Sequence, residues 1–368
     1  MNILVQLSHP AHFHLYKNAI KNWKNNGNSV HVLIKTKDIL EDLLHNSQIP
    51  YHNILPLAHR KNKIGVLWDM LVRDWKILCF CRKYKIDLLT GSTPEVAQVS
   101  KLLGLYSINT GEDDMAIVPA FERVAGPFIK CILAPVTCNL GQLEHKSVHY
   151  PGFQKLAYLH PKRFVPNKGI LGKYDIDITT PYFIIRFAQL NAHHDVGVNG
   201  ISTEVAQNLV DILKPYGSIY ITSERPLEPQ FEKYRLHINP LDIHHIMAFA
   251  TLYIGDSQSM AVEAAMLGVP SLRFNDFVGK KKIGVMEELE HVYGLTFGIS
   301  SHEPEKLYTK IKELLEKPYL QEEFQIKRKK MLEDKIDVTA FLIWFVENFP
   351  QSQIQAENAT EEFWEQFK

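Results

Sequence analysis

The chain of 368 residues has no excess of charge of either sign, because 41 lysines and arginines balance 41 aspartates and glutamates. Domains that bind nucleic acid usually carry net positive charge, so this balance argues against nucleic acid as a partner. No apolar window reaches the length of a membrane span. The chain begins directly with an expected strand, without a signal-type basic and apolar segment. We therefore expect a cytoplasmic protein.

Cysteine is scarce, and the residues that could bind metal are poorly spaced for it. None of the four cysteines forms the C-x-x-C pair of a zinc site, which also indicates a reducing compartment. Histidines 9, 12 and 14 lie close together, but no carboxylate or thiolate stands near them to complete a metal site. We therefore expect no bound metal.

Three common nucleotide and hydrolase signatures are also missing. There is no G-x-G-x-x-G after the first expected strand and no Walker A sequence, which argues against NAD and ATP. There is no G-x-S-x-G sequence either, which argues against an α/β-hydrolase.

What the chain does have is a regular alternation of expected strands and helices, in two blocks separated by a proline- and glycine-rich linker at about 151–181. Such alternation predicts α/β domains with mostly parallel sheets. The length also favours two domains. We expect domains at 1–165 and 166–335, followed by a C-terminal helix and a frayed acidic tail at 336–368. The strands are expected at 3–7, 30–34, 51–55, 86–90, 106–109, 131–134 and 148–150, and then at 182–187, 218–222, 253–255, 269–272 and 295–297.

Residues 253–273 form the most informative stretch. A short apolar strand ends at Gly255, Asp256 and Ser257 offer helix N-caps, and a small-residue helix follows. A helix N-terminus attracts phosphate through its free N–H groups and its dipole. Glu263 is the only charge in that helix, and a lone carboxylate among alanines needs a partner. One interpretation is a diphosphate at the helix start, with Glu263 holding a ribose. The other is a simple N-cap and an exposed glutamate.

Polar residues follow other expected strands of the second block, where open parallel sheets bind their ligands. Arg186 could bind a phosphate. Ser223 ends the next strand, and His237 lies in a loop that could meet a nucleobase. The loop after the first of these strands carries a further polar group, namely Asn191, His193, His194 and Asp195. The lysines at 280–282 are either a basic rim of the same site or a solvated run.

The first block has two comparable strand ends. His9, His12 and His14 open its first helix, where a histidine could act as a general base or as a donor to sugar or phosphate. The alternative is that His9 caps a turn and His14 faces solvent. Residues 112–114 are three successive carboxylates, Glu112 and Asp113 among them, which form either an acid–base group or a solvated turn.

The order of three motifs resembles the glycosyltransferase GT-B superfamily. Within it, the chain resembles an uncharacterised family related to the non-hydrolysing UDP-N-acetylglucosamine 2-epimerases. The resemblance covers residues 1–348. It rests on His9-Pro-Ala-His12, on Asn191-Ala-His-His-Asp195, and on Gly255-Asp-Ser-Gln-Ser-Met-Ala-Val-Glu263 with Leu267-Gly-Val-Pro270.

The resemblance implies two Rossmann-like parallel-sheet domains facing across a cleft, with a C-terminal helix crossing back to the first. In the epimerases the corresponding serine contacts the diphosphate and the final glutamate contacts the ribose, which maps these roles onto Ser257 and Glu263. Gln258 and Ser259 stand where the epimerases have two glycines. His12 corresponds to an acceptor-side histidine of GT-B transferases.

On this basis we expect a glycosyltransferase of surface polysaccharide or glycolipid assembly that uses a nucleotide sugar, UDP-linked, as substrate and needs no cofactor. Its second domain would hold the nucleotide, and its first would present a lipid-linked or saccharide acceptor beside His12 as base. A lipid-linked acceptor would bring a peripheral membrane contact. The residues expected to hold the nucleotide are Arg186, Ser223, His237, Ser257, Gln258, Ser259 and Glu263.

Two alternatives stay open. The first is an epimerase or hydrolase of the nucleotide sugar, in which Glu112, Asp113 and His193 move protons; Glu112 is the counterpart of a glutamate in the first domain of the epimerases. The second is a non-catalytic protein that binds a nucleotide or a sugar. The oligomeric state is not predicted.

Overall fold

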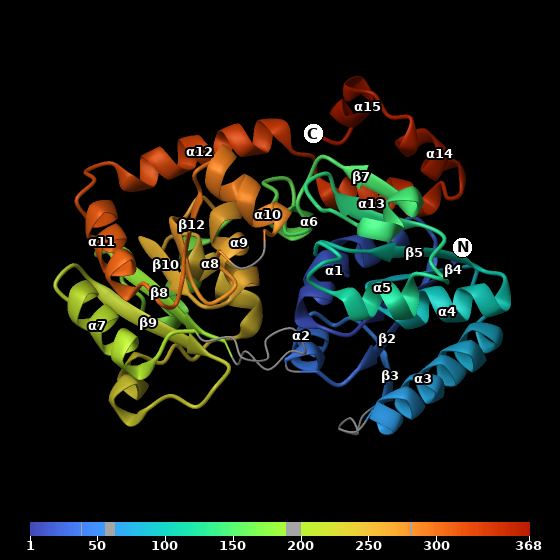
Figure 1. The fold of residues 1–368 in the computed structure, drawn as a ribbon, viewed down its shortest axis with the longest axis horizontal. Coiled ribbons are helices and arrows are strands. Elements are labelled where there is room, and N and C mark those ends of the chain that lie inside the picture. Colours follow the sequence, from blue (N-terminus) through green and yellow to red (C-terminus); the bar gives the residue numbers. More distant parts are fainter. Residues whose placement is uncertain (38, 56–62, 189–199, 280–281) are drawn as a thin grey trace. The chain divides into compact units, whose positions relative to one another are not determined.

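The computed structural model describes residues 1–37, 39–55, 63–188, 200–279 and 282–368. It divides into two compact units, each built on its own sheet (Figure 1). Unit 1 comprises Met1–Arg163 together with Lys335–Lys368, and unit 2 comprises Phe164–Asp334. The boundaries expected from the sequence were 165/166 and 335/336, and the structure joins the C-terminal segment to the first unit.

Unit 1 contains a seven-stranded sheet in the order β3-β2-β1-β4-β5-β6-β7 among its described residues. Every pair of neighbouring strands is parallel, so the carboxyl ends of all strands lie along one edge. The sequence predicted a strand at each of these places. The strands are β1 (Asn2–Leu7), β2 (Ser29–Lys35), β3 (His52–Leu55), β4 (Leu88–Gly91), β5 (Tyr106–Thr110), β6 (Ile132–Pro135) and β7 (Ser147–Tyr150).

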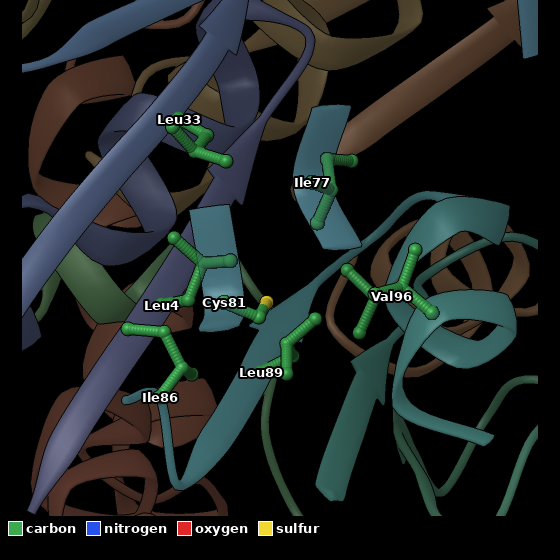
Figure 2. Packing of buried hydrophobic residues seen from close by; sticks show 8 residues of the cluster. Leu4, Leu33, Ile77, Cys81, Ile86, Leu89 and Val96 are labelled. Atoms are coloured by element: carbon green, nitrogen blue, oxygen red, sulfur yellow. The ribbon is translucent and has the colours of Figure 1, made fainter. Parts of the chain in front are cut away.

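Apolar side chains fill the space between this sheet and two of its helices. Leu4 and Leu89 of the sheet meet Ile77 of α3 and Val96 of α4, all with at most 1% of their surface exposed (Figure 2). This burial is the main stabilising contribution to such a layer. The helices before the linker are α1 (Pro10–Asn25), α2 (Leu40–Asn46), α3 (Lys63–Lys83), α4 (Pro94–Leu103), α5 (Pro119–Ala125) and α6 (Leu156–Leu159).

The C-terminal segment completes unit 1, as the resemblance implied. The helix α13 (Val338–Glu347) packs against α1 and α6 of this unit. Asp337 caps α13 by accepting the N–H of Ala340 at 3.1 Å, and it also pairs with Arg163 at 2.7 Å. Asp337 is buried, so this ion pair fixes the point at which the chain re-enters the unit.

The prediction of a frayed tail is wrong. The last residues form α14 (Gln351–Glu357) and α15 (Glu361–Glu365). Phe367, next to the end of the chain, is buried, and its ring lies 5.5 Å from those of Phe341 and Trp344. Aromatic residues in the tail therefore supply the burial that its acidic composition concealed.

Unit 2 contains a five-stranded parallel sheet in the order β12-β11-β10-β8-β9 within the described residues. Its strands are β8 (Tyr182–Phe187), β9 (Ser218–Ser223), β10 (Leu252–Gly255), β11 (Ser271–Phe274) and β12 (Thr296–Ile299). Its helices are α7 (Thr203–Leu213), α8 (Ile243–Met247), α9 (Gln258–Met266), α10 (Gly284–Glu287), α11 (Pro304–Leu315) and α12 (Leu320–Asp334). In the described part of the chain, no helix is both long enough and apolar enough to cross a membrane.

Candidate functional site

The loop between β10 and α9 lies at the carboxyl edge of the unit 2 sheet, as the sequence predicted. Ser257 is the N-cap of α9, and its side chain accepts the N–H of Met260 at 3.4 Å. The first N–H groups of a helix have no intrahelical acceptor, which leaves those of Gln258 and Ser259 for other partners. Ser259 is exposed and Gln258 is half-buried, so an anion could approach this helix start from solvent.

The strand end before this loop leaves room only for glycine. A Cβ on Gly255 would lie 2.5 Å from the hydroxyl oxygen of Tyr253 and 2.9 Å from Cβ of Arg186, its register partner in β8. Both distances are shorter than van der Waals contact. The close approach of β8 and β10 therefore brings Arg186 next to the loop that contains Ser257.

Asp256 faces the protein interior, although the sequence placed it at the phosphate. Its carboxylate accepts the N–H of Ala188 at 2.6 Å and that of Ile201 at 3.3 Å. A Cβ on Gly200 would lie 2.3 Å from Oδ2 of Asp256, so glycine is required there too. Burial raises the pKa of Asp256 to about 6, and the two N–H groups partly oppose this shift. Asp256 thus fastens together two distant points of the chain beside the helix start.

We expect Asp256→Asn to change how stability depends on pH. The pKa of Asp256 is about 6 in the folded protein and 3.8 as its ordinary value, so between these pH values only the folded state holds the proton. Its contribution to stability is therefore full below pH 3.8 and is lost as the pH rises through 6. From pH 4.5 to pH 7.5 the free energy of unfolding of the variant should rise relative to wild type by about 2 kcal/mol. Urea unfolding of both proteins at both pH values measures this change. If the free energies of unfolding of variant and wild type differ by the same amount at both pH values, the raised pKa of Asp256 is contradicted.

Glu263 is buried, so the interpretation of an exposed glutamate is wrong. Its Oε1 lies 3.3 Å from Nε2 of His244, a residue of α8 that is itself only 2% exposed. The sequence indicated that this carboxylate needs a partner, and the structure identifies one in His244. The two side chains lie within ion-pair distance, and a polar neighbour of this kind lowers the cost of burying the carboxylate. The exposed fraction of Glu263 is 7%.

Two more predicted residues lie at the same edge of the sheet. Arg186 forms an ion pair with Glu224, and the Nε of Arg186 is buried with no hydrogen-bond partner among the described residues. Ser223 ends β9, where its hydroxyl donates to the carbonyl of Arg225 at 2.6 Å. The register pairs Arg186 with both Gly255 and Thr222, so three neighbouring strands end together here.

The sequence missed Arg225 at this edge. Its guanidinium lies 4.9 Å from the ring of Phe187 and donates a hydrogen bond to the carbonyl of Ile201. His237 is exposed in the loop before Pro240. Among the described residues, His237 makes no hydrogen bond or ion pair with Arg186, Ser223 or Ser257. His193 and the rest of its loop lie outside the described residues, as do the lysines at 280 and 281.

In unit 1, His12 is held as a neutral ring. Its Nδ1 accepts the N–H of Ser8 at 3.3 Å. Burial above all lowers the pKa of His12 to about 3, and the neighbouring His9 and the positive charges of Lys35 and Lys155 contribute to this shift. With Nδ1 accepting, the ring proton is assigned to Nε2. This geometry favours His12 as a hydrogen-bond donor, because a group with a pKa of about 3 is a weak base at neutral pH.

The other two histidines of this motif have structural contacts. His9 is the N-cap of α1, and its Nδ1 accepts the N–H of Ala11 at 3.1 Å, which confirms that it caps. His14 is 7% exposed and its ring lies 5.0 Å from that of Tyr158. The alternative in which His14 faces solvent is therefore wrong.

Glu112 holds the segment that follows β7. Its Oε1 accepts the N–H of Gln154 at 2.8 Å, and its Oε2 pairs with Lys155. The side chains of Glu112 and Lys155 are both largely buried, at 12% and 10% exposed. Asp113 is exposed, whereas Asp114 is buried and accepts the N–H of Asn139 at 2.6 Å. The three carboxylates thus lie in different environments, and neither a purely solvated turn nor a single cluster describes them.

We expect Lys155→Met to lower the free energy of unfolding by about 2 kcal/mol, because Glu112 would keep a largely buried charge without its cation. Glu112→Gln with Lys155→Met should be more stable than Lys155→Met alone. A double-mutant cycle in urea measures the coupling between the two side chains. If the two substitutions change the free energy of unfolding additively, the ion pair contributes nothing to stability.

A chain of hydroxyl groups at the centre of the unit 1 sheet edge was also missed. The hydroxyl of Tyr16 lies 2.8 Å from that of Thr90 and 3.2 Å from that of Thr110, which lies 2.7 Å from that of Ser92. Burial raises the pKa of Tyr16 to about 12. The half-buried Ser92 is the end of this chain nearest to solvent.

In the described part of the chain, no group of three or more histidines, cysteines and acids is arranged to hold a metal ion. No protein-family model matches the chain, and no curated protein sequence matches it. Membership of the uncharacterised family suggested by the sequence therefore stays a prediction.

Comparison with solved structures identifies the fold. S. aureus MnaA, solved with UDP, superposes with a TM-score of 0.67 over 96% of this chain and 98% of its own, at 12% identity. The UDP-GlcNAc 2-epimerase of Neisseria meningitidis, bound to UDP-GlcNAc, has a TM-score of 0.66 over 94% and 100%, at 14% identity. The spinosyn rhamnosyltransferase SpnG, complexed with thymidine diphosphate, has a TM-score of 0.62 over 95% and 100%, at 15% identity. The chain has the GT-B fold. At these identities the likeness establishes the GT-B architecture and leaves the reaction open.

Proposed function

We propose that the protein binds a nucleoside diphosphate sugar in unit 2 and transfers the sugar to an acceptor. The observation that carries the proposal is the arrangement at the carboxyl edge of the unit 2 sheet. There the start of α9, capped by Ser257, adjoins Arg186, and the buried Glu263 lies 3.3 Å from His244. GT-B proteins solved with UDP, UDP-GlcNAc and thymidine diphosphate support the same class of ligand.

Each group has a defined part in this proposal. The N–H groups at the start of α9 and the hydroxyl of Ser257 donate to the diphosphate, whose negative charge the helix dipole also favours. Arg186 adds a cation that neutralises the leaving diphosphate as the bond to the sugar breaks. As the acceptor oxygen bonds to the sugar, its hydroxyl proton passes to the leaving diphosphate. Glu263 accepts hydrogen bonds from the ribose hydroxyls. No metal is needed for these interactions.

Unit 1 supplies the acceptor side of the reaction. His12 donates its Nε2 proton in a hydrogen bond to a substrate oxygen, and it stays neutral because its pKa is about 3. The acceptor is a saccharide or a lipid-linked saccharide, as in the assembly of a surface polysaccharide or glycolipid.

Binding of nucleotides tests the first part of the proposal. Isothermal titration with UDP, thymidine diphosphate and ADP should give a dissociation constant in the micromolar range for one of them, and a matching rise of the melting temperature. Ser257→Ala should weaken that binding, whereas Ile326→Ala, at an exposed position of α12, should leave it unchanged. Failure of all three nucleotides to bind would contradict the proposal.

An epimerase is the second candidate, because one of the similar structures is a UDP-GlcNAc 2-epimerase bound to UDP-GlcNAc. Another, MnaA, is solved with UDP. The ion pair of Glu112 with Lys155 favours a structural role for the carboxylate that an epimerase would use. Incubation with UDP-GlcNAc and no acceptor separates the two. Formation of an epimerised nucleotide sugar would contradict transfer. A nucleotide sugar that stays unchanged without acceptor and is consumed when acceptor is added would support transfer.

A further inference from the structure

The helix α3 has apolar side chains on two opposite faces. Ile77 and Cys81 point into the core of unit 1, where they are at most 2% exposed (Figure 2). Trp68, Leu71 and Trp75 recur at the spacing of one helix face, and their exposed fractions are 56%, 53% and 65%. At about 100° per residue this face points away from Ile77. We call Trp68, Leu71 and Trp75 the tryptophan face.

The tryptophan face exposes more apolar surface than the fold requires. From the size of these side chains the three together expose on the order of 400 Å². A contiguous exposed patch of this size usually marks an interaction site. A stable dimer buries about 800 Å² on each partner, so the tryptophan face alone is too small to hold a second copy of the chain. A shallow hollow of about 220 Å³ between the same side chains and Val72 adds little depth for a protruding partner residue.

Charge on the helix surface indicates which partner fits. Arg82 and Lys83 are exposed in the last turn of α3, and Arg82 follows Trp75 by seven residues, which places it along the same line. The acids Asp69 and Asp74 lie roughly 100–120° round the helix from Trp75. Lys83 lies about 80° round the helix from Trp75. Arg82 therefore continues the tryptophan face, while Lys83 and the acids lie to its sides.

We propose that the tryptophan face docks onto the surface of an anionic lipid bilayer. Tryptophan is favoured at the boundary between lipid headgroups and hydrocarbon, because its ring is apolar and its N–H can stay hydrated. Arg82 and Lys83 lie against anionic headgroups, each adding attraction that salt weakens. The helix lies on the bilayer and does not cross it. This proposal is independent of the reaction proposed above, because it rests only on α3.

Sedimentation with vesicles tests it on the full chain. The protein should sediment with vesicles of phosphatidylglycerol and phosphatidylcholine mixed equally, and at least about tenfold less with phosphatidylcholine alone. The fluorescence of Trp68 and Trp75 should shift to shorter wavelength on binding, because the indoles leave water. Trp68→Ala with Trp75→Ala should weaken binding at least about tenfold.

Two further variants keep the test specific. Arg82→Gln with Lys83→Gln should weaken binding to the anionic vesicles and remove most of its dependence on salt. Ile326→Ala, which removes an equally exposed apolar side chain in unit 2, should bind as wild type does. The proposal is overturned if wild type does not sediment with anionic vesicles, or if the double tryptophan variant sediments equally. A dimer in solution that the double tryptophan variant dissociates would also overturn it, by assigning the face to a second copy.

Discussion

Glu263→Ala is expected to abolish measurable nucleotide binding and to lower the free energy of unfolding by about 3 kcal/mol. The loss of stability follows because His244, 2% exposed, would be left in the interior without the carboxylate 3.3 Å away. The loss of binding follows from the proposed contact with ribose, whose removal leaves hydroxyl groups of the ligand unpaired. Urea unfolding and isothermal titration with the preferred nucleotide measure the two effects separately.

Glu263→Gln separates these contributions. Glutamine keeps the shape of the side chain and one acceptor, so stability should recover most of the way towards wild type, while binding should stay at least about tenfold weaker. A Glu263→Gln variant that binds the nucleotide as tightly as wild type would show that the carboxylate serves only His244 and the packing of α9.

His12→Ala is expected to reduce kcat by about 100- to 1,000-fold, the usual effect of removing a donor that stabilises charge in a transition state. We also expect a particular dependence of the wild-type activity on pH. Because the pKa of His12 is about 3, the ring stays neutral from pH 5 to pH 9 and adds no fall in activity near pH 6.5. Steady-state kinetics of sugar transfer across this range would measure both.

The control for His12 is His291→Gln, at an exposed histidine of unit 2 that lies 3.7 Å from Glu287 across one helical turn. This variant should keep the wild-type kcat. Unchanged turnover in His12→Ala would remove His12 from the chemistry. A loss of activity below pH 6.5 that disappears in His12→Ala would instead indicate a base with an ordinary pKa.

The fold was predictable because its signals are local. Alternating apolar strands and helices, with breaks at proline and glycine, predicted each of the twelve strands of the described residues at nearly its observed place. The start of α9 was predictable for the same reason, since a cap such as Ser257 is read from its neighbours in sequence. The return of the C-terminal segment came from the resemblance and is confirmed by the packing of α13 on α1.

The partners of the site residues were harder to predict, because they lie far apart in the sequence. The need of Glu263 for a partner was visible, but His244 as that partner was not. The same holds for Lys155, which lies 43 positions from Glu112 and meets it only once β5 and β7 are in one sheet. The environment of a side chain was equally hard to predict, because nothing near His12 in the sequence shows that burial lowers its pKa to about 3. The tail was misjudged because its acids were given more weight than its aromatic residues, although residues 349–368 contain four of each.

The return of Lys335–Lys368 to unit 1 has a consequence for the growing chain on the ribosome. Unit 2 is continuous in sequence, so all of its residues have been synthesised when Asp334 is added. Unit 1 begins before unit 2 in the sequence, yet the helix that covers α1 and α6 is made only after unit 2. Domains generally fold as soon as their residues have emerged. Unit 1 is therefore completed only after unit 2 has been synthesised, and until then the apolar surface of α1 and α6 lacks the helix that covers it.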